Sequence, residues 1–172
     1  MLVLTIRAPE RRTGFYALRG HRVFGVPARA VTGIVVVLGD RRFEAEQHGE
    51  AWTIDGRAAT PGTAAALGDL ATTLAGLRSV DVFRARDGAS YGLGQPHGWV
   101  EVRTARVRRR LDLGDLTAGG GTLYARRAGD PRVLQIGTGL LSSFQRVLYE
   151  RDGRAPVPAP GAGREAQRPE IG

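Results

Sequence analysis

Three residues near the start of the chain have the types and the spacing of a metal site. Glu44, Glu46 and His48 alternate with Phe43 and Ala45, so all three would point to one face of a strand. Carboxylates and imidazoles are common ligands of divalent cations. The same alternation is typical of any half-exposed strand whose Phe43 and Ala45 face the core. We favour that simpler interpretation and expect neither a metal nor another cofactor.

A run of arginines offers a second candidate site. Arg106, Arg108 and Arg110 would share one face of a strand, opposite Val107 and Leu111. A basic strand face can bind nucleic acid, anionic lipid or an acidic protein. No aromatic residue is interleaved with these arginines to stack on bases. A charged edge strand that resists pairing with other sheets is the interpretation we favour, with the binding patch as the alternative.

The sequence offers little for covalent catalysis. It contains four serines, none of them in a Gly-x-Ser-x-Gly elbow, and no cysteine. Because lysine is also absent, a phosphate loop of the Gly-Lys-Ser/Thr type is excluded. Asp112 and Asp115 flank a predicted turn at Gly114, where we expect them to be solvated. We therefore expect no enzymatic activity and no small-molecule substrate.

The positive charge of the chain comes from arginine alone. The 172 residues carry a net charge of +8, and all 25 cationic residues are arginine. Asparagine is missing as well as lysine, and both have adenine-rich codons, which indicates a high-GC genome. The basic pI is therefore weak evidence for nucleic-acid binding.

No apolar run reaches the roughly 20 residues of a membrane helix, and Met1–Ile6 is too short for a secretory signal.

The hydrophobic pattern predicts an α+β fold. Thr60 and Pro61 form a helix start, and Leu67, Leu70 and Leu74 recur on one helical face. A second amphipathic helix begins at Thr138. Strands are predicted over residues 31–38, 41–48, 51–54, 80–83, 99–104, 108–114, 122–126 and 132–136. Short connections favour a mostly antiparallel, meandering sheet with both helices on one face, and the strand–strand–strand–helix order of the two halves is compatible with an old duplication.

Composition divides the chain into three parts. We expect an extended lead-in over residues 1–22, a single α+β domain over residues 23–152, and a disordered tail over residues 153–172. The tail is rich in proline and glycine and has no aromatic residue.

The order of these features resembles the bacterial domain-of-unknown-function 4340 family. The segments that carry the resemblance are a valine–isoleucine strand, the Trp52-x-Ile54 strand, the leucine-faced helix, the turn from Tyr91 to Pro96, Leu113-Gly114, and Tyr124 with Arg126. Together they cover about residues 22–150. Gly94 replaces the aspartate usual in that turn. The family's N-terminal membrane helix has no counterpart in Met1–Ile6, so we expect either a truncated start or a soluble member.

The resemblance implies a non-enzymatic accessory domain, often tethered to a membrane and associated with ABC-type transport systems, including those of gliding motility. It implies a protein partner in such a complex and a membrane-associated or extracytoplasmic location, although the sequence itself leaves a cytoplasmic location open. The expected function is therefore an interaction module. The alternative is a basic module that binds nucleic acid or an anionic surface through Arg106, Arg108 and Arg110.

Overall fold

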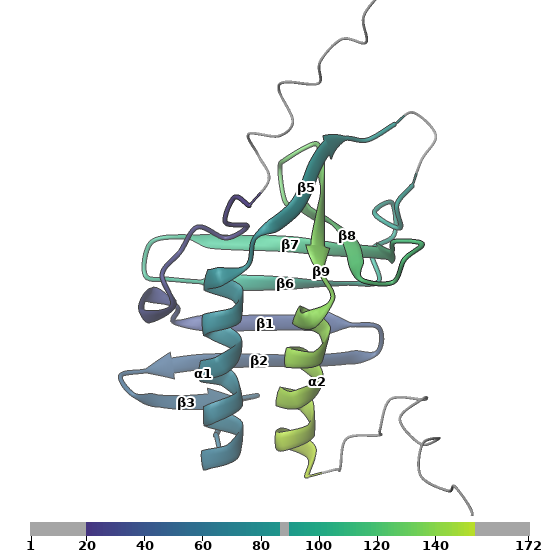
Figure 1. Cartoon of the computed structure of the whole chain (residues 1–172). Helices are drawn as coiled ribbons and strands as arrows, with labels where there is room; N and C mark the ends of the chain where they lie inside the picture. The colour runs from purple at the N-terminus through teal and green to yellow at the C-terminus, as the bar shows by residue number, and fades with distance from the viewer. Residues whose placement is uncertain (1–19, 87–89, 154–172) are drawn as a thin grey trace, which may run out of the picture.

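Nine strands form one antiparallel sheet, and two helices lie side by side on one of its faces (Figure 1). This computed structural model describes residues 20–86 and 90–153. The α+β class and the antiparallel sheet predicted from the sequence are thus confirmed. The elements are η2 (Ala28–Ala30), β1 (Gly33–Leu38), β2 (Arg41–His48), β3 (Ala51–Ile54), β4 (Arg57–Ala58), α1 (Pro61–Gly76), β5 (Ser79–Arg84), β6 (Gly98–Arg103), β7 (Arg108–Leu116), β8 (Thr122–Arg127), β9 (Arg132–Gly137) and α2 (Gly139–Asp152).

The sheet consists of two meanders that meet at its centre. The strand order is β4-β3-β2-β1-β6-β7-β8-β9-β5, and β1 pairs with β6 antiparallel, with Gly33 opposite Arg103 and Leu38 opposite Gly98. Each meander has four strands and ends in a helix: β1 to β4 lead into α1, and β6 to β9 lead into α2. The two halves therefore share one element order. β5 departs from it, because it follows α1 but pairs with β9 at the edge of the other half.

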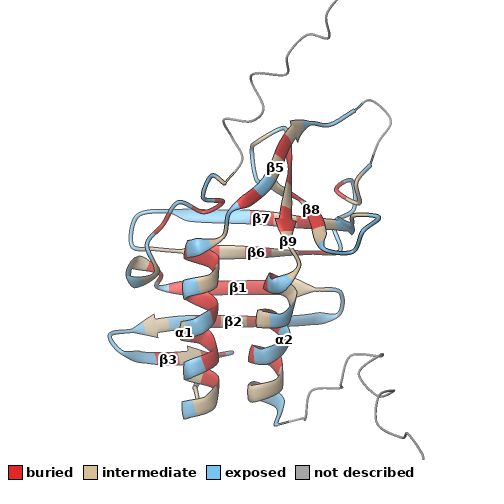
Figure 2. Ribbon diagram, in the orientation of Figure 1, coloured by how far each residue is buried: buried red, intermediate tan, exposed pale blue. Residues whose placement is uncertain are grey.

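The core lies between the helices and the sheet (Figure 2). Alternation on β2 places Phe43 and Ala45 on the helix side, where both are fully buried. The leucine stripe of α1 and Phe144 of α2 meet this face. Burying each large apolar side chain contributes roughly 1.5–3 kcal/mol, so these facing stripes hold both helices on one side of the sheet.

The first helix begins as its sequence predicts. The backbone N–H of Thr63 donates to Thr60 Oγ1 over 3.2 Å, and Pro61 occupies the first helical position. The second helix begins at Gly139 and ends before Gly153, whose φ of 64° closes it in the left-handed conformation. Neither helix, nor any other in the described ranges, is long and apolar enough to cross a membrane.

Two local predictions were wrong. The sequence analysis missed β4, which forms because Asp55 and Gly56 both adopt positive φ (50° and 75°) in a tight hairpin turn. The turn predicted at Gly114 does not exist, because β7 continues through it to Leu116 with an irregular register beyond Leu113.

Residues 90–97, which precede β6, fold over the helix-free side of the sheet. Leu93 is buried, and its carbonyl oxygen accepts a 2.9 Å hydrogen bond from Arg126 Nη2. Tyr91 packs edge-on against Phe83 and Tyr124, with ring centroids 5.5 and 4.9 Å away. The structured turn predicted around Tyr91 is therefore present, and it covers part of the second face.

Candidate functional site

Arginines replace core residues at one end of the sheet. Four adjacent strands each carry an arginine two positions away from a buried core residue. Because side chains alternate along a strand, each arginine lies on the same, helix-facing side of the sheet as that core residue. The pairs of core residue and arginine are Val82 and Arg84 on β5, Leu134 and Arg132 on β9, Ala125 and Arg127 on β8, and Leu111 and Arg109 on β7. The apolar face thus ends in a row of guanidinium groups.

This row opens into a groove of about 800 Å³. The groove is lined by the four arginines of the row together with Arg108 and Arg110, against a single carboxylate, that of Asp130. The turn between β8 and β9, which includes Ala128 and Pro131, forms its floor. Because arginine stays charged at any physiological pH, the lining carries a large excess of positive charge. We call this site the arginine groove.

Asp130 neutralises part of that charge. Arg132 donates from Nε to Asp130 Oδ1 over 2.9 Å and from Nη2 to Oδ2 over 2.7 Å, and its backbone N–H also donates to Oδ1. Arg127 Nη2 lies 3.6 Å from Oδ2. Hydrogen bonds from Arg132, with the charges of Arg132 and Arg127, lower the pKa of Asp130 to about 2. The groove therefore already binds one carboxylate, its own.

Two arginines of the groove are uncommitted. The exposed guanidinium groups of Arg84 and Arg108 make no hydrogen bond or ion pair with any residue in the part of the chain that the structure describes. Arg127 Nε is buried and likewise lacks a partner among the described residues. The exposed donors of Arg84 and Arg108 are available to an incoming anion, whereas the buried Nε of Arg127 is not accessible from the surface.

Other arginines of the groove also hold the start of the described chain. Arg109 Nη1 donates to the carbonyl oxygen of Phe24, and Arg127 Nη1 donates to that of Val23 over 3.4 Å. Val23 and Phe24 are both buried in the core. Arg109 therefore has a structural role in addition to lining the groove.

The structure separates the three arginines that the sequence analysis grouped together. Arg106 lies in the turn before β7 and does not line the groove, whereas Arg108 and Arg110 do. The edge-strand explanation of this run was wrong, because β7 lies between β6 and β8 in the interior of the sheet. Protection against edge pairing therefore does not account for these charges.

Arg110 is more constrained than its neighbour Arg108. Its guanidinium carbon lies 4.3 Å from the ring centroid of Trp99 on β6, and Nε donates to Asp112 over 2.8 Å. The sequence shows no aromatic residue within the arginine run, but strand pairing supplies one from β6. Asp112 is thus part of an ion pair, and Asp115 pairs with His97 across 2.6 Å, so neither is the simple solvated charge that the sequence predicted.

The three candidate metal ligands on β2, which the sequence analysis favoured as an ordinary solvent face, take part in ion pairs. Glu44 pairs with Arg103 at 2.6 Å and with Arg42 at 2.8 Å, and the hydrogen bond from Arg103 lowers its pKa. His48 Nε2 lies 3.5 Å from Glu46. Across residues 20–86 and 90–153, no group of three histidine, cysteine or acidic side chains is placed to hold a metal ion.

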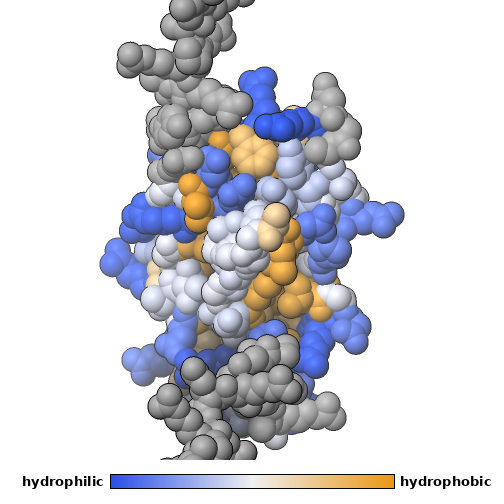
Figure 3. Space-filling view, turned by 45° about the vertical axis from the view of Figure 1, so that its right-hand side comes forward, coloured by the Kyte–Doolittle hydropathy of each residue, from blue (hydrophilic) through white to orange (hydrophobic). Residues whose placement is uncertain are grey.

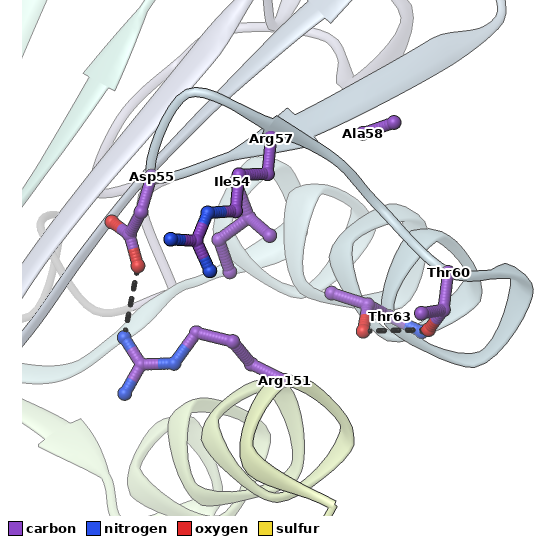
Figure 4. Close-up of a pocket in the computed structure, with 7 residues that line it drawn as sticks. All are labelled: Ile54, Asp55, Arg57, Ala58, Thr60, Thr63 and Arg151. Carbon is purple, nitrogen blue, oxygen red and sulfur yellow. Dashed lines mark hydrogen bonds and ion pairs between the residues drawn. The ribbon is translucent and has the colours of Figure 1, made fainter.

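A second hollow of about 380 Å³ lies where the β3–β4 turn meets the ends of both helices (Figure 4). Arg57 and Arg151 approach each other there, but Arg151 pairs with Asp55 at 3.0 Å and with Asp152 at 2.7 Å. A Cβ on Gly62 would collide with the carboxylate of Glu150, so an acid already covers the N-terminus of α1. The lining of this hollow contains two arginines and one aspartate, and Arg151 is already paired, so its excess of positive charge is smaller than that of the arginine groove.

Figure 3 shows one face of the molecule. Hydrophilic side chains lie mainly at its edges, and a strip of apolar side chains runs down its middle beside side chains of intermediate hydropathy. Among the described residues, the exposed large hydrophobic side chains are Val80, Val107 and Leu116, which lie on separate segments. These three side chains are therefore scattered and do not form one apolar patch.

The sequence analysis found two of the groove residues and missed the others for a definite reason. Arg127 and Arg132 lie on consecutive strands, but Arg84 lies on β5, far from them in the chain, and only the order β7-β8-β9-β5 places all three in one row. The sequence does show that each of these arginines falls on the same side of its own strand as the core residues. This alternation predicts a shared site only when the pairing of the strands is known.

Comparison with known proteins supports the resemblance noted from the sequence. The family model described as Domain of unknown function (DUF4340) matches residues 52–148, from β3 to α2. No curated protein and no solved structure matches the chain. The matched segment is more than half of the 172 residues and includes Trp52, the leucine-faced helix and the turn at Tyr91. The chain therefore belongs to the DUF4340 family.

Proposed function

We propose that this protein is a non-catalytic interaction domain that binds an anionic partner through the arginine groove. The observation that carries the proposal is the row of arginines on four adjacent strands, six in all around the groove against one aspartate. Like charges so close together oppose folding, because they repel one another at short range. A binding role gives a reason for the presence of Arg84 and Arg108, whose side chains make no stabilising contact with the described residues.

The family resemblance suggests the setting of this interaction. Members of the family are associated with ABC-type transport systems, and on that basis we propose a subunit of a membrane transport complex as the partner. The domain would act by docking, with the groove supplying the contact. The nucleic-acid alternative has less support, because no aromatic side chain lines the groove to stack on bases.

A pull-down from gently solubilised native membranes tests the proposal. The wild-type chain is compared with an Arg84→Gln, Arg108→Gln variant, in which both exposed arginines lack partners in the described structure, so the fold should be retained. Arg29→Gln with Arg41→Gln is the matched control, because both are exposed arginines outside the groove. We expect transporter subunits with the wild type and the control, and their loss with the groove variant.

Two outcomes would contradict the proposal. Equal recovery with the groove variant and the control would show that the groove is not the docking site. Recovery of only ribosomal and nucleic-acid-bound proteins, which wash off as salt is raised, would favour the nucleic-acid alternative.

A further inference from the structure

The geometry points to an extended acidic segment of a protein as the ligand of the arginine groove. This inference rests on the proposed function and specifies the chemistry of the partner. It depends on three features of the groove: its span across the strands, its lining, and the way in which Asp130 occupies it.

The span of the groove fits several anionic groups in a line. Arg84, Arg132 and Arg127 lie on the neighbouring strands β5, β9 and β8, and Arg108 to Arg110 lie on β7. Neighbouring strands are about 4.8 Å apart, so the cations extend over roughly 14 Å. An extended polypeptide covers that distance in about four or five residues at roughly 3.3 Å per residue. A single small anion would contact only part of the row.

The lining of the groove argues against nucleic acid. Its volume of about 800 Å³ lies in the range of ligand sites. The absence of aromatic side chains from the lining removes the stacking platform that single-stranded nucleic acid needs. Carboxylates along a peptide do not require stacking.

Asp130 shows how a carboxylate is bound in this groove. It accepts two parallel hydrogen bonds from Arg132 and lies near Arg127. An aspartate or glutamate of a partner would take the same geometry on Arg84 or on Arg108, each of which lacks a partner among the described residues. Because Asp130 occupies Arg132, it also competes with the ligand for that guanidinium. Asp130 therefore occupies the place of a ligand carboxylate and lowers the affinity of the groove for an acidic ligand.

The inference is tested by fluorescence anisotropy on the full chain. The probe is a labelled eight-residue peptide of alternating Glu and Ala, and its partner is the same peptide with Gln in place of Glu. We expect the Gln peptide to bind at least about tenfold more weakly, since charge-assisted hydrogen bonds carry the contact. Arg84→Gln with Arg108→Gln should weaken binding of the Glu peptide by about tenfold, and Arg29→Gln with Arg41→Gln by less than about twofold.

The Asp130→Asn variant gives a second readout with the opposite sign. Asparagine keeps an oxygen that can accept from the backbone N–H of Arg132 but removes the negative charge. We expect it to bind the Glu peptide about three- to tenfold more tightly. A variant that had merely disturbed the turn would bind more weakly, so a gain in affinity separates the two explanations.

Competition with other anions tests whether the ligand of the groove is an acidic protein segment. A single-stranded oligonucleotide, phosphatidylglycerol vesicles and tripolyphosphate should each displace the Glu peptide less effectively than unlabelled Glu peptide does. The inference is overturned if any of them binds more tightly than the peptide, or if the Glu and Gln peptides bind equally. A groove-dependent pull-down combined with no peptide binding would reject this inference while leaving the proposed function intact.

Discussion

Asp130 and Arg132 form a bidentate ion pair inside the arginine groove, with Nε–Oδ1 and Nη2–Oδ2 distances of 2.9 and 2.7 Å. The two residues are separated only by Pro131, so the turn between β8 and β9 holds the pair in place. Arg132 is therefore engaged by the chain itself, as are Arg109, Arg110 and Arg127 through other contacts, whereas Arg84 and Arg108 have no partner among the described residues. The pair makes both the stability and the binding of the groove dependent on this carboxylate.

Stability should fall in acid partly because of Asp130. Its pKa is lowered from 3.8 to about 2, chiefly by hydrogen bonds from Arg132. A lowered pKa in the folded state contributes stability that is complete above the unfolded value and is lost as the pH falls from about 4 to 2. We expect Asp130→Asn to lower the free energy of unfolding by roughly 1–2 kcal/mol at about pH 6 and by much less near pH 2. Urea denaturation of both proteins across this range measures the difference, and a difference independent of pH would contradict the assignment.

Neutralising the groove should stabilise the free domain. Arg84→Gln with Arg108→Gln removes repulsion without removing any partner in the described structure, and we expect the melting temperature to rise by about 2 °C at low ionic strength. The gain should shrink at about 1 M salt, where the screening length falls to about 3 Å. The control pair Arg29→Gln and Arg41→Gln removes the same net charge. An equal rise in that control would attribute the effect to overall charge instead of the groove.

Arg109 should matter for folding more than Arg108, although the two are adjacent. Arg109 donates to the carbonyl of the buried Phe24, whereas Arg108 makes no side-chain contact of this kind with the described residues. We expect Arg109→Gln to cost roughly 1–3 kcal/mol in unfolding free energy and Arg108→Gln less than about 0.5 kcal/mol. Chemical denaturation gives both values. Hydrogen exchange of the backbone amides around Phe24 should be faster only in the Arg109 variant. Similar exchange rates in both variants would contradict the role of Arg109 in holding Phe24.

Gly114 should be intolerant of a side chain. A Cβ at this position would collide with the carbonyl oxygen of Tyr91 and would crowd Leu93, which the turn presses onto β7. We expect Gly114→Ala to cost about 2–3 kcal/mol, as overpacking does elsewhere. Gly119→Ala is the matched control, because nothing lies within 4 Å of its built Cβ. Thermal denaturation that shows the same loss for both would mean that the turn does not pack as described.

The sequence predicted well those features whose signals are local. Thr60 and Pro61 fix the start of α1, and the alternation around Phe43 fixes the buried face of β2, because capping and burial act over a few residues. The two-residue strand β4 left no such signal beyond the Asp55–Gly56 turn. The predicted lead-in and tail lie largely outside the described residues.

The site was harder to predict because it depends on strand pairing. Trp99 and Arg110 are 11 positions apart, and Arg84 and Arg132 are 48 positions apart, yet each pair meets in the sheet. Nothing in the run from Arg106 to Arg110 indicates that β7 is an interior strand or that β5 crosses to join β9. The arginines line one groove because of the long-range pairing of their strands, which residue type alone does not predict.

Site-specific photo-crosslinking tests the docking role of the groove most directly. A benzoylphenylalanine is placed at Ala128, an exposed residue of the groove floor, and in a matched protein at Ala51, an exposed residue of β3 outside the groove. After irradiation in native membranes, we expect the protein labelled at position 128 to capture a partner that raised salt or the Arg84→Gln, Arg108→Gln change prevents from binding. The protein labelled at position 51 should capture none of it. Capture from position 51 alone, or equally from both positions, would contradict the groove as the docking surface.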